Sequence, residues 1–104
     1  MTSPPLGCVP GAIPAGKRTA HFDLLARVFG QSARSRERLP DGYRYRFDGD
    51  ALGDLTAFIA NERRCCPFLS FALEIAPADG PILLRLTGPA GVHEFLDAEL
   101  PAIL

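Results

Sequence analysis

The sequence has no tryptophan, one methionine and only three cysteines among its 104 residues. Three cysteines give no obvious disulfide framework, and an odd number is typical of a compartment in which thiols stay reduced. The net charge of −1 provides no overall field that would attract nucleic acid or an anionic membrane. No apolar run approaches the roughly 20 residues that cross a bilayer, and the first residues lack the basic and apolar regions of a signal peptide. We therefore expect a cytoplasmic protein with neither a nucleic-acid nor a membrane partner.

Composition and length indicate a single globular domain. Apolar residues make up 47% of the chain and charged residues 22%, as in an ordinary soluble protein. A chain of 104 residues has room for one modest core. Residues 1–16 contain four prolines and three glycines and show neither helical nor strand periodicity. We expect an irregular N-terminal arm over residues 1–16 and one domain over residues 17–104.

The body of the chain alternates helical and strand patterns. Residues 17–30 repeat apolar side chains at helical spacing, among them Phe22, Leu25 and Phe29. Strict alternation over residues 43–47 is typical of a half-buried strand. The other expected elements are a strand after residue 32 in a hairpin with 43–47, a helix over 50–64 capped by Asp50, strands over 68–75 and 82–86, and a helix after Gly88-Pro89. The order αββαββα predicts an α+β fold, a four-stranded antiparallel sheet with helices packed on one face.

The most informative segment is residues 62–69, Glu-Arg-Arg-Cys-Cys-Pro-Phe-Leu. Adjacent cysteines are poor candidates for a structural disulfide, because the ring that they would close is very small. Cys65 and Cys66 are better suited to direct two thiolates at one soft centre, and Cys8 in the N-terminal arm offers a third. Zn(II), Cu(I), Hg(II) and As(III) all accept sulfur ligands, and geometry and ligand number decide among them. We therefore expect a soft metal or metalloid ion at Cys8, Cys65 and Cys66, for sensing, buffering or transfer rather than for catalysis.

Two other functions fit the same residues. In a thiol-reactive or redox protein, one of Cys65 and Cys66 is the nucleophile and the other resolves it, while Arg63 or Arg64 stabilises the thiolate. In a ligand-binding or interaction module, the cysteines only pack in the core. The sequence contains no nucleophile elbow, phosphate-binding loop, dinucleotide fingerprint or zinc-protease helix, so hydrolytic and cofactor-dependent chemistry lacks support.

The double-cysteine segment also carries a resemblance. Together with the Leu39-Pro-Asp-Gly turn and the Leu86-Thr-Gly-Pro segment, it resembles a family of small, poorly characterised bacterial proteins with an E-x-x-C-C-P-F-L motif. Similar members carry a cysteine near the start, where this chain has Cys8. The resemblance implies that Cys8, Cys65 and Cys66 act as one set, and it implies a heavy-metal context, but it brings no established activity.

Other polar residues are expected to be passive. The arginines of the hairpin are expected to line its solvated face: Arg34, Arg36, Arg38, Arg44 and Arg46. His21 is a candidate fourth ligand or thiol base, but a surface position near the start of a helix is commoner. His93 is expected on the polar side of the last helix. Phe58 and Phe95 are expected to anchor their helices in the core, and an exposed edge strand favours a homodimer.

Overall fold

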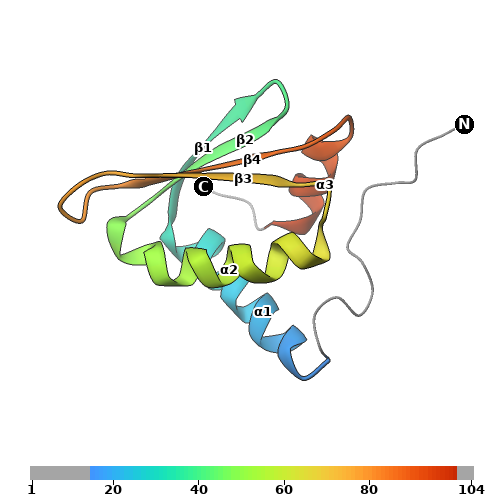
Figure 1. Cartoon of the computed structure of the whole chain (residues 1–104), viewed down its shortest axis with the longest axis horizontal. Helices are drawn as coiled ribbons and strands as arrows, with labels where there is room; N and C mark the ends of the chain where they lie inside the picture. Colours follow the sequence, from blue (N-terminus) through green and yellow to red (C-terminus); the bar gives the residue numbers. More distant parts are fainter. Residues whose placement is uncertain (1–14, 101–104) are drawn as a thin grey trace, which may run out of the picture.

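The computed structural model describes residues 15–100, with side chains from residue 20 onward. The elements, in chain order, are α1 (Ala15–Arg27), a π-helical turn (Val28–Ser32), β1 (Ala33–Leu39), β2 (Gly42–Phe47), a 3-10 turn (Gly49–Ala51), α2 (Leu52–Cys65), β3 (Ser70–Ile75), β4 (Ile82–Thr87) and α3 (Val92–Glu99) (Figure 1). The expected order αββαββα is confirmed. The first helix begins two residues earlier than expected, and the rest of the expected arm, including Cys8, lies outside the described residues.

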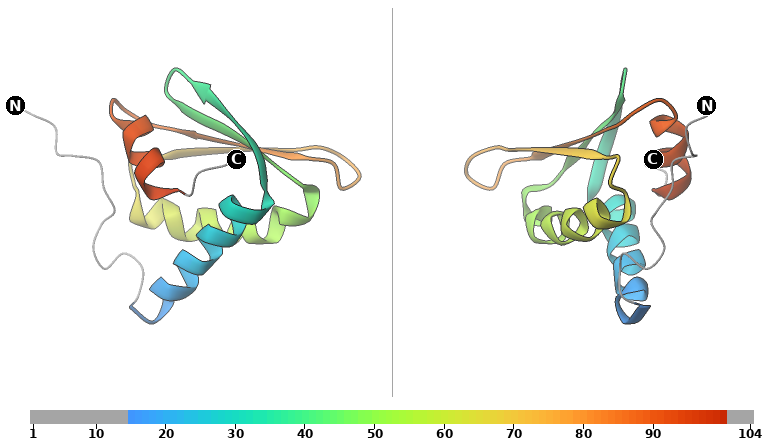
Figure 2. Two further views of the ribbon diagram at one scale, coloured as in Figure 1. Left: turned by 180° about the vertical axis from the view of Figure 1, so that it is seen from behind. Right: turned by 45° about the vertical axis from the view of Figure 1, so that its right-hand side comes forward.

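The four strands form one antiparallel sheet in the order β1-β2-β4-β3. Alternation in β2 and β4 places two rows of apolar side chains on one face, Tyr43, Tyr45 and Phe47 beside Ile82, Leu84 and Leu86. α2 and α3 contact this face, through Phe58 on Phe71 and through the bond from Tyr43 to Asp97, and the π-helical turn after α1 packs on it through Phe29 and Tyr45. The fold is therefore α+β with its core between the sheet and one layer of helices (Figure 2).

An aromatic cluster joins the two layers. The Phe29 ring meets the rings of Tyr45, Phe47 and Phe58 edge-on, at centroid distances of 5.1, 5.5 and 4.9 Å. Edge-to-face contacts at these distances are favourable beyond the area that they bury. Phe58 is fully buried, as expected. Phe95 is only partly buried and packs against Phe68, so Val92 and Leu96 are the residues that anchor α3.

Two local predictions were wrong. The apolar face predicted for the first helix is buried at Leu25 and Phe29 but not at Phe22, which is 60% exposed while His21 beside it is buried. Asp50 does not cap α2: it lies within the 3-10 turn, and the residue that precedes α2 is Ala51, with no side-chain cap. The 3-10 turn offers its own backbone bond, Ala51 N to Asp48 O, where a side-chain cap was expected.

The hairpin arginines do not share one face. In the β1–β2 register, Arg36 lies opposite Tyr45 and Arg38 opposite Tyr43, so both project from the helix-covered face. Arg44 lies opposite Glu37 on the open face and forms an ion pair with it. The prediction of a single arginine face was therefore wrong, because the register places Arg36 and Arg38 on the face of the tyrosines and Arg44 on the opposite face.

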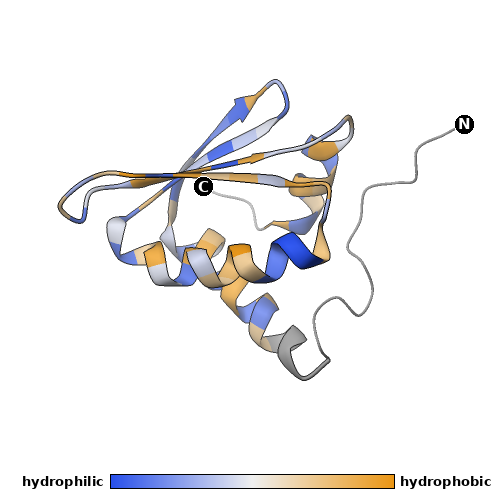
Figure 3. Ribbon diagram, viewed as in Figure 1, coloured by the Kyte–Doolittle hydropathy of each residue, from blue (hydrophilic) through white to orange (hydrophobic). Residues whose placement is uncertain are grey.

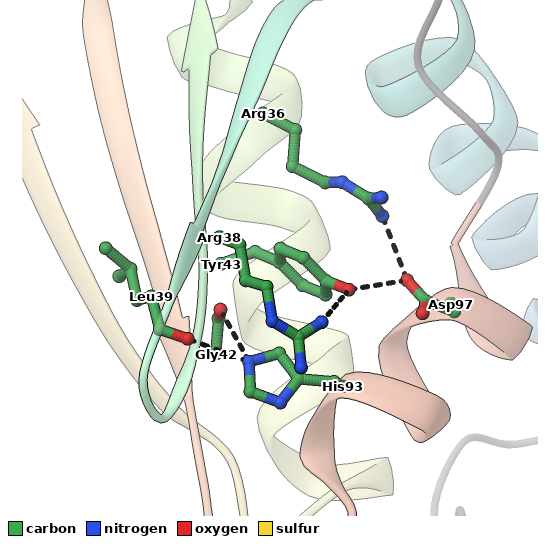
Figure 4. Close-up of polar contacts among 7 residues, drawn as sticks. All are labelled: Arg36, Arg38, Leu39, Gly42, Tyr43, His93 and Asp97. Carbon is green, nitrogen blue, oxygen red and sulfur yellow. Dashed lines mark hydrogen bonds and ion pairs between the residues drawn. The ribbon is translucent and has the colours of Figure 1, made fainter.

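A polar network docks α3 on this hairpin (Figure 4). Arg36 Nη1 and the Tyr43 hydroxyl both donate to Asp97 Oδ1, at 3.0 and 2.9 Å, and the Arg36 guanidinium lies 4.1 Å from the centre of the Tyr43 ring. His93 Nε2 donates to the carbonyl oxygens of Leu39 and Gly42, at 2.8 and 3.1 Å. His93 is thus not an idle residue on the polar side of α3, as the sequence indicated, because it holds the β1–β2 turn.

Tyr45 should make the fold sensitive to alkaline pH. Its hydroxyl is buried with no hydrogen-bond partner among the described residues, and burial raises the pKa of Tyr45 to about 12 against the opposing effect of Arg36. An unfolded tyrosine has a pKa of about 10, so raising the pH from about 10 to about 12 ionises the unfolded chain first and removes on the order of 2–3 kcal/mol of stability.

Tyrosinate absorbance and denaturant unfolding measure this effect cleanly, because the chain has two tyrosines and no tryptophan. Burial, followed by the hydrogen bond to Asp97, also raises the pKa of Tyr43. Tyr45→Phe should remove most of the loss of stability and should fold well, since it deletes a hydroxyl without a partner. Two tyrosines that titrate together near pH 10 would contradict this assignment.

Candidate functional site

Cys65 and Cys66 lie where α2 ends. Pro67 disfavours helical geometry in the residue before it, and Cys66 accordingly leaves the helix with φ −123° and ψ 77°. Its backbone N–H still reaches back to Glu62 O at 2.7 Å. Both cysteines are buried, with 8% and 0% of their surfaces exposed, and no disulfide joins Cys65 to Cys66 in the described part of the chain. The sequence thus places two reduced thiols in the interior, beside the end of one helix.

Glu62 is the immediate polar neighbour of Cys66. The two residues are four apart, so the residue at the helix end lies beside the side chain one turn earlier. Cys66 Sγ donates a hydrogen bond to Glu62 Oε1 at 3.1 Å. Glu62 is itself 1% exposed and occupies a position in the buried stripe of α2 that also contains Leu55 and Phe58. A carboxylate in a core stripe is costly unless its oxygens have partners.

His21 supplies the second partner, from α1. Its Nε2 lies 2.9 Å from Glu62 Oε2, and its ring stacks on Phe58 with 6° between the planes and 6.2 Å between the centroids. A carboxylate oxygen accepts, which assigns the ring proton to Nε2. The other ring nitrogen, His21 Nδ1, is buried with no hydrogen-bond partner in residues 15–100. The expectation that His21 lies on the surface was therefore wrong.

We name these three residues, Cys66, Glu62 and His21, the thiol–carboxylate–imidazole network. The bond between His21 and Glu62 connects α1 to α2 across 41 residues of sequence. The bond between Glu62 and Cys66 joins residues only four apart. Replacement of such buried polar groups by apolar residues of similar volume is often neutral or stabilising.

The arginines before the cysteines lie elsewhere. Arg63 and Arg64 are exposed, although Glu62 before them and Cys65 after them are buried. Figure 3 shows the same change along α2, where a strongly hydrophilic segment precedes its hydrophobic end. Within the described part of the chain, a carboxylate, that of Glu62, accepts the hydrogen bond of the Cys66 thiol.

The described residues do not by themselves complete a metal centre. No three histidine, cysteine, aspartate or glutamate side chains within residues 15–100 are grouped closely enough to hold an ion. Cys8, the third expected thiolate, lies outside the described residues. Cys65 and Cys66 are brought to one helix end, as the sequence predicted, and His21 and Glu62 join them.

Comparisons with known proteins give no identification: no family model, no curated protein and no solved structure matches the chain. The resemblance to a double-cysteine family therefore stays a prediction from the motif. Among the described helices, none is long and apolar enough to cross a membrane.

Sequence reasoning missed Glu62 and misplaced His21, although both left a signal. The buried residues Ala51, Leu55, Phe58, Glu62 and Cys65 follow one another at intervals of three or four, so Glu62 interrupts an apolar stripe. His21 has the same helical spacing to Leu25 and Val28. A polar residue at a core position of a periodic helix indicates a buried partner elsewhere in the chain.

Proposed function

We propose that the protein binds a soft metal or metalloid ion through the thiolates of Cys65 and Cys66 together with Cys8, and senses, buffers or transfers that ion. The observation that carries the proposal is the thiol–carboxylate–imidazole network. Thiolate and imidazole are the donors that soft and borderline ions prefer. A carboxylate behind a histidine is the usual outer support of a metal ligand, since it fixes the ring and its proton.

Burial favours ion binding over a thiol-reactive function. Reactive cysteines lie in partly exposed, electropositive surroundings. Cys66 is fully buried beside a carboxylate, and Arg63 and Arg64 are exposed. An external disulfide or electrophile would have to enter the core to reach its sulfur, whereas a single ion needs far less room.

The network also argues against cysteines that only pack. A free cysteine in a core behaves as a small hydrophobe and needs no polar neighbour. Here the Cys66 thiol bonds to Glu62, and Glu62 requires His21 in turn. A core that used the cysteines for packing alone would be at least as stable with an apolar residue at position 62.

Ion titration of the reduced full-length chain tests the proposal. Hg(II), Cu(I), Zn(II) and As(III) are added in turn under anaerobic conditions, and the near-ultraviolet thiolate-to-ion absorption and the bound ion are measured. We expect one ion per chain, and a loss of affinity of at least about 100-fold in each of Cys8→Ser, Cys65→Ser and Cys66→Ser, as for the removal of a ligand. Phe22→Ala is the matched control, because Phe22 is largely exposed on α1.

Two results would overturn the proposal. The first is that none of the four ions produces a thiolate absorption band. The second is that all three serine variants bind as tightly as the parent chain. Rapid alkylation of Cys66 in the folded protein, with no ion bound by any variant, would instead favour the thiol-reactive function.

A further inference from the structure

We infer that the outer edge of β3 is the interface of a homodimer, in which β3 of one copy pairs antiparallel with β3 of a second copy about a twofold axis. This inference goes beyond the proposed ion site and does not depend on it. β3 is one of the two outermost strands of the sheet, and within residues 15–100 it pairs with β4 alone (Figure 1). An outermost strand carries backbone N–H and C=O groups to which a strand of another chain can bond.

Two backbone hydrogen bonds show which residues of β3 present these groups to the free side. Just beyond the strands, Ala76 N donates to Pro81 O at 3.2 Å, in the register of the β3–β4 pairs, so the even-numbered residues of β3 bond to β4. The bond from Gly88 N to Asp41 O, at 2.9 Å, agrees with this, since it directs the even-numbered residues of β4 to β2 and the odd-numbered ones to β3. The backbone groups on the free side of β3 therefore belong to Phe71, Leu73 and Ile75.

The side chains at the same three positions are apolar. In the β3–β4 register they lie opposite buried residues of β4, so they belong to the helix-covered face. Phe71 and Leu73 are half-buried, and Ile75 is 54% exposed. Apolar surface at the margin of a core is stabilised when an apolar neighbour removes it from water.

One register of the two copies uses both the backbone groups and the side chains. A twofold axis at Leu73 pairs this residue with its own copy, and pairs Phe71 with Ile75 of the second copy. Each of these pairs is then a hydrogen-bonded pair that exchanges both backbone bonds. The exposed isoleucine is covered by a phenylalanine ring. On the open face, Glu74 lies opposite the small Ala72 of the second copy, so like charges do not meet.

The neighbouring registers are less favourable. An axis at Glu74 would place this residue directly opposite its own copy, and like charges in that position destabilise a strand pair. An axis at Ala72 would place Ile75 opposite Leu69, which precedes β3 and is buried. The axis at Leu73 is therefore the one that the strand supports.

Amide hydrogen exchange in the unaltered, full-length chain tests the interface residue by residue. The protein is kept reduced, with a chelator present, and exchange is followed by nuclear magnetic resonance from about 50 μM to about 1 mM protein, the range of weak complexes with small interfaces. Mass action should slow exchange at Phe71, Leu73 and Ile75 by roughly 2–5-fold over this range. The control amides are those of Arg36 and Arg38, on the free side of β1 by the same alternation, and their rates should stay constant.

Charge variants on the open face test the register. Ala72→Glu faces Glu74 of the second copy, twice by symmetry, and should raise the dissociation constant from sedimentation equilibrium by about 10-fold. Adding Glu74→Lys replaces both repulsions by opposite-charge pairs and should restore the dimer. Ser35→Glu in β1 is the matched control and should leave the constant unchanged. Both new carboxylates replace exposed residues and lie opposite an arginine of their own sheet, Arg85 for position 72 and Arg46 for position 35.

The results that would overturn the inference are specific. A chain that stays monomeric up to about 1 mM contradicts it, and so does a dimer in which the odd-numbered amides of β3 exchange at the same rate at all concentrations. Equal effects of Ala72→Glu and Ser35→Glu, or no restoration by Glu74→Lys, would contradict the assigned pairing. If Ala72→Glu fails to fold, amide exchange in the parent chain still decides the question. Ion binding is decided separately, by the ion titration.

Discussion

Phe58→Ala should lower the free energy of unfolding by about 3–5 kcal/mol, which is a large part of the stability of a domain of this size. Phe58 is fully buried and lies at the meeting point of both layers, with Phe29 at 4.9 Å, Phe71 at 6.5 Å and the stacked ring of His21 at 6.2 Å. Alanine would remove all three ring contacts and leave a cavity between the layers.

Urea unfolding followed by far-ultraviolet circular dichroism measures this loss. The matched control is Phe22→Ala, the same substitution at a residue that is 60% exposed, and we expect a change within about 0.5 kcal/mol. Equal midpoints for the two variants would mean that Phe58 does not hold α2 against the sheet.

His21→Ala should be nearly as damaging, at about 3–5 kcal/mol, for a different reason. It leaves Glu62 Oε2 buried without its partner, and removing one member of a buried polar pair costs far more than the pair contributes. It also deletes the ring that stacks on Phe58. The loss therefore has an electrostatic part and a packing part.

A double-mutant cycle separates the two parts. His21→Phe retains the stacked ring, and Glu62→Leu removes the group that needs a partner. We expect each single variant to be destabilised, and the double variant to be more stable than the sum of the single effects by about 1–3 kcal/mol. Strict additivity would show that the contact between the two side chains carries no energy.

The elements of the fold were predictable because they depend on local periodicity. The alternation of Tyr43, Tyr45 and Phe47 identified β2, and Pro67 correctly ended α2 at the cysteines. The face of α1 was not predictable in the same way. Phe22 and Leu25 have the three-residue spacing of a helical stripe, but His21 and Leu25, four residues apart, fit a stripe equally well. Burial of His21 depends on Glu62, 41 residues away, which local spacing does not reveal.

In the candidate site, too, the features that depend on local sequence could be predicted, and those that depend on distant residues could not. Two adjacent thiols at a helix end could be predicted from residues 62–69 alone. The partner of Glu62, His21, could not be predicted, because it required knowledge of which sides of α1 and α2 face each other. The split of the hairpin arginines had the same cause: Arg36 and Arg38 reached the helix side through the pairing register, which the sequence of a single strand does not specify.

The strand order β1-β2-β4-β3 leaves two very different free edges. β1, Ala-Arg-Ser-Arg-Glu-Arg-Leu, presents charges along nearly its whole length, and charged edges resist pairing with other chains. β3, Ser-Phe-Ala-Leu-Glu-Ile, has one charged residue and ends at Ile75, which is 54% exposed. Growth of the sheet from one molecule to another is thus discouraged at β1 and weakly opposed at β3. At high protein concentration, the self-association of this chain would begin on the β3 side, and a lysine placed there would be the simplest protection against it.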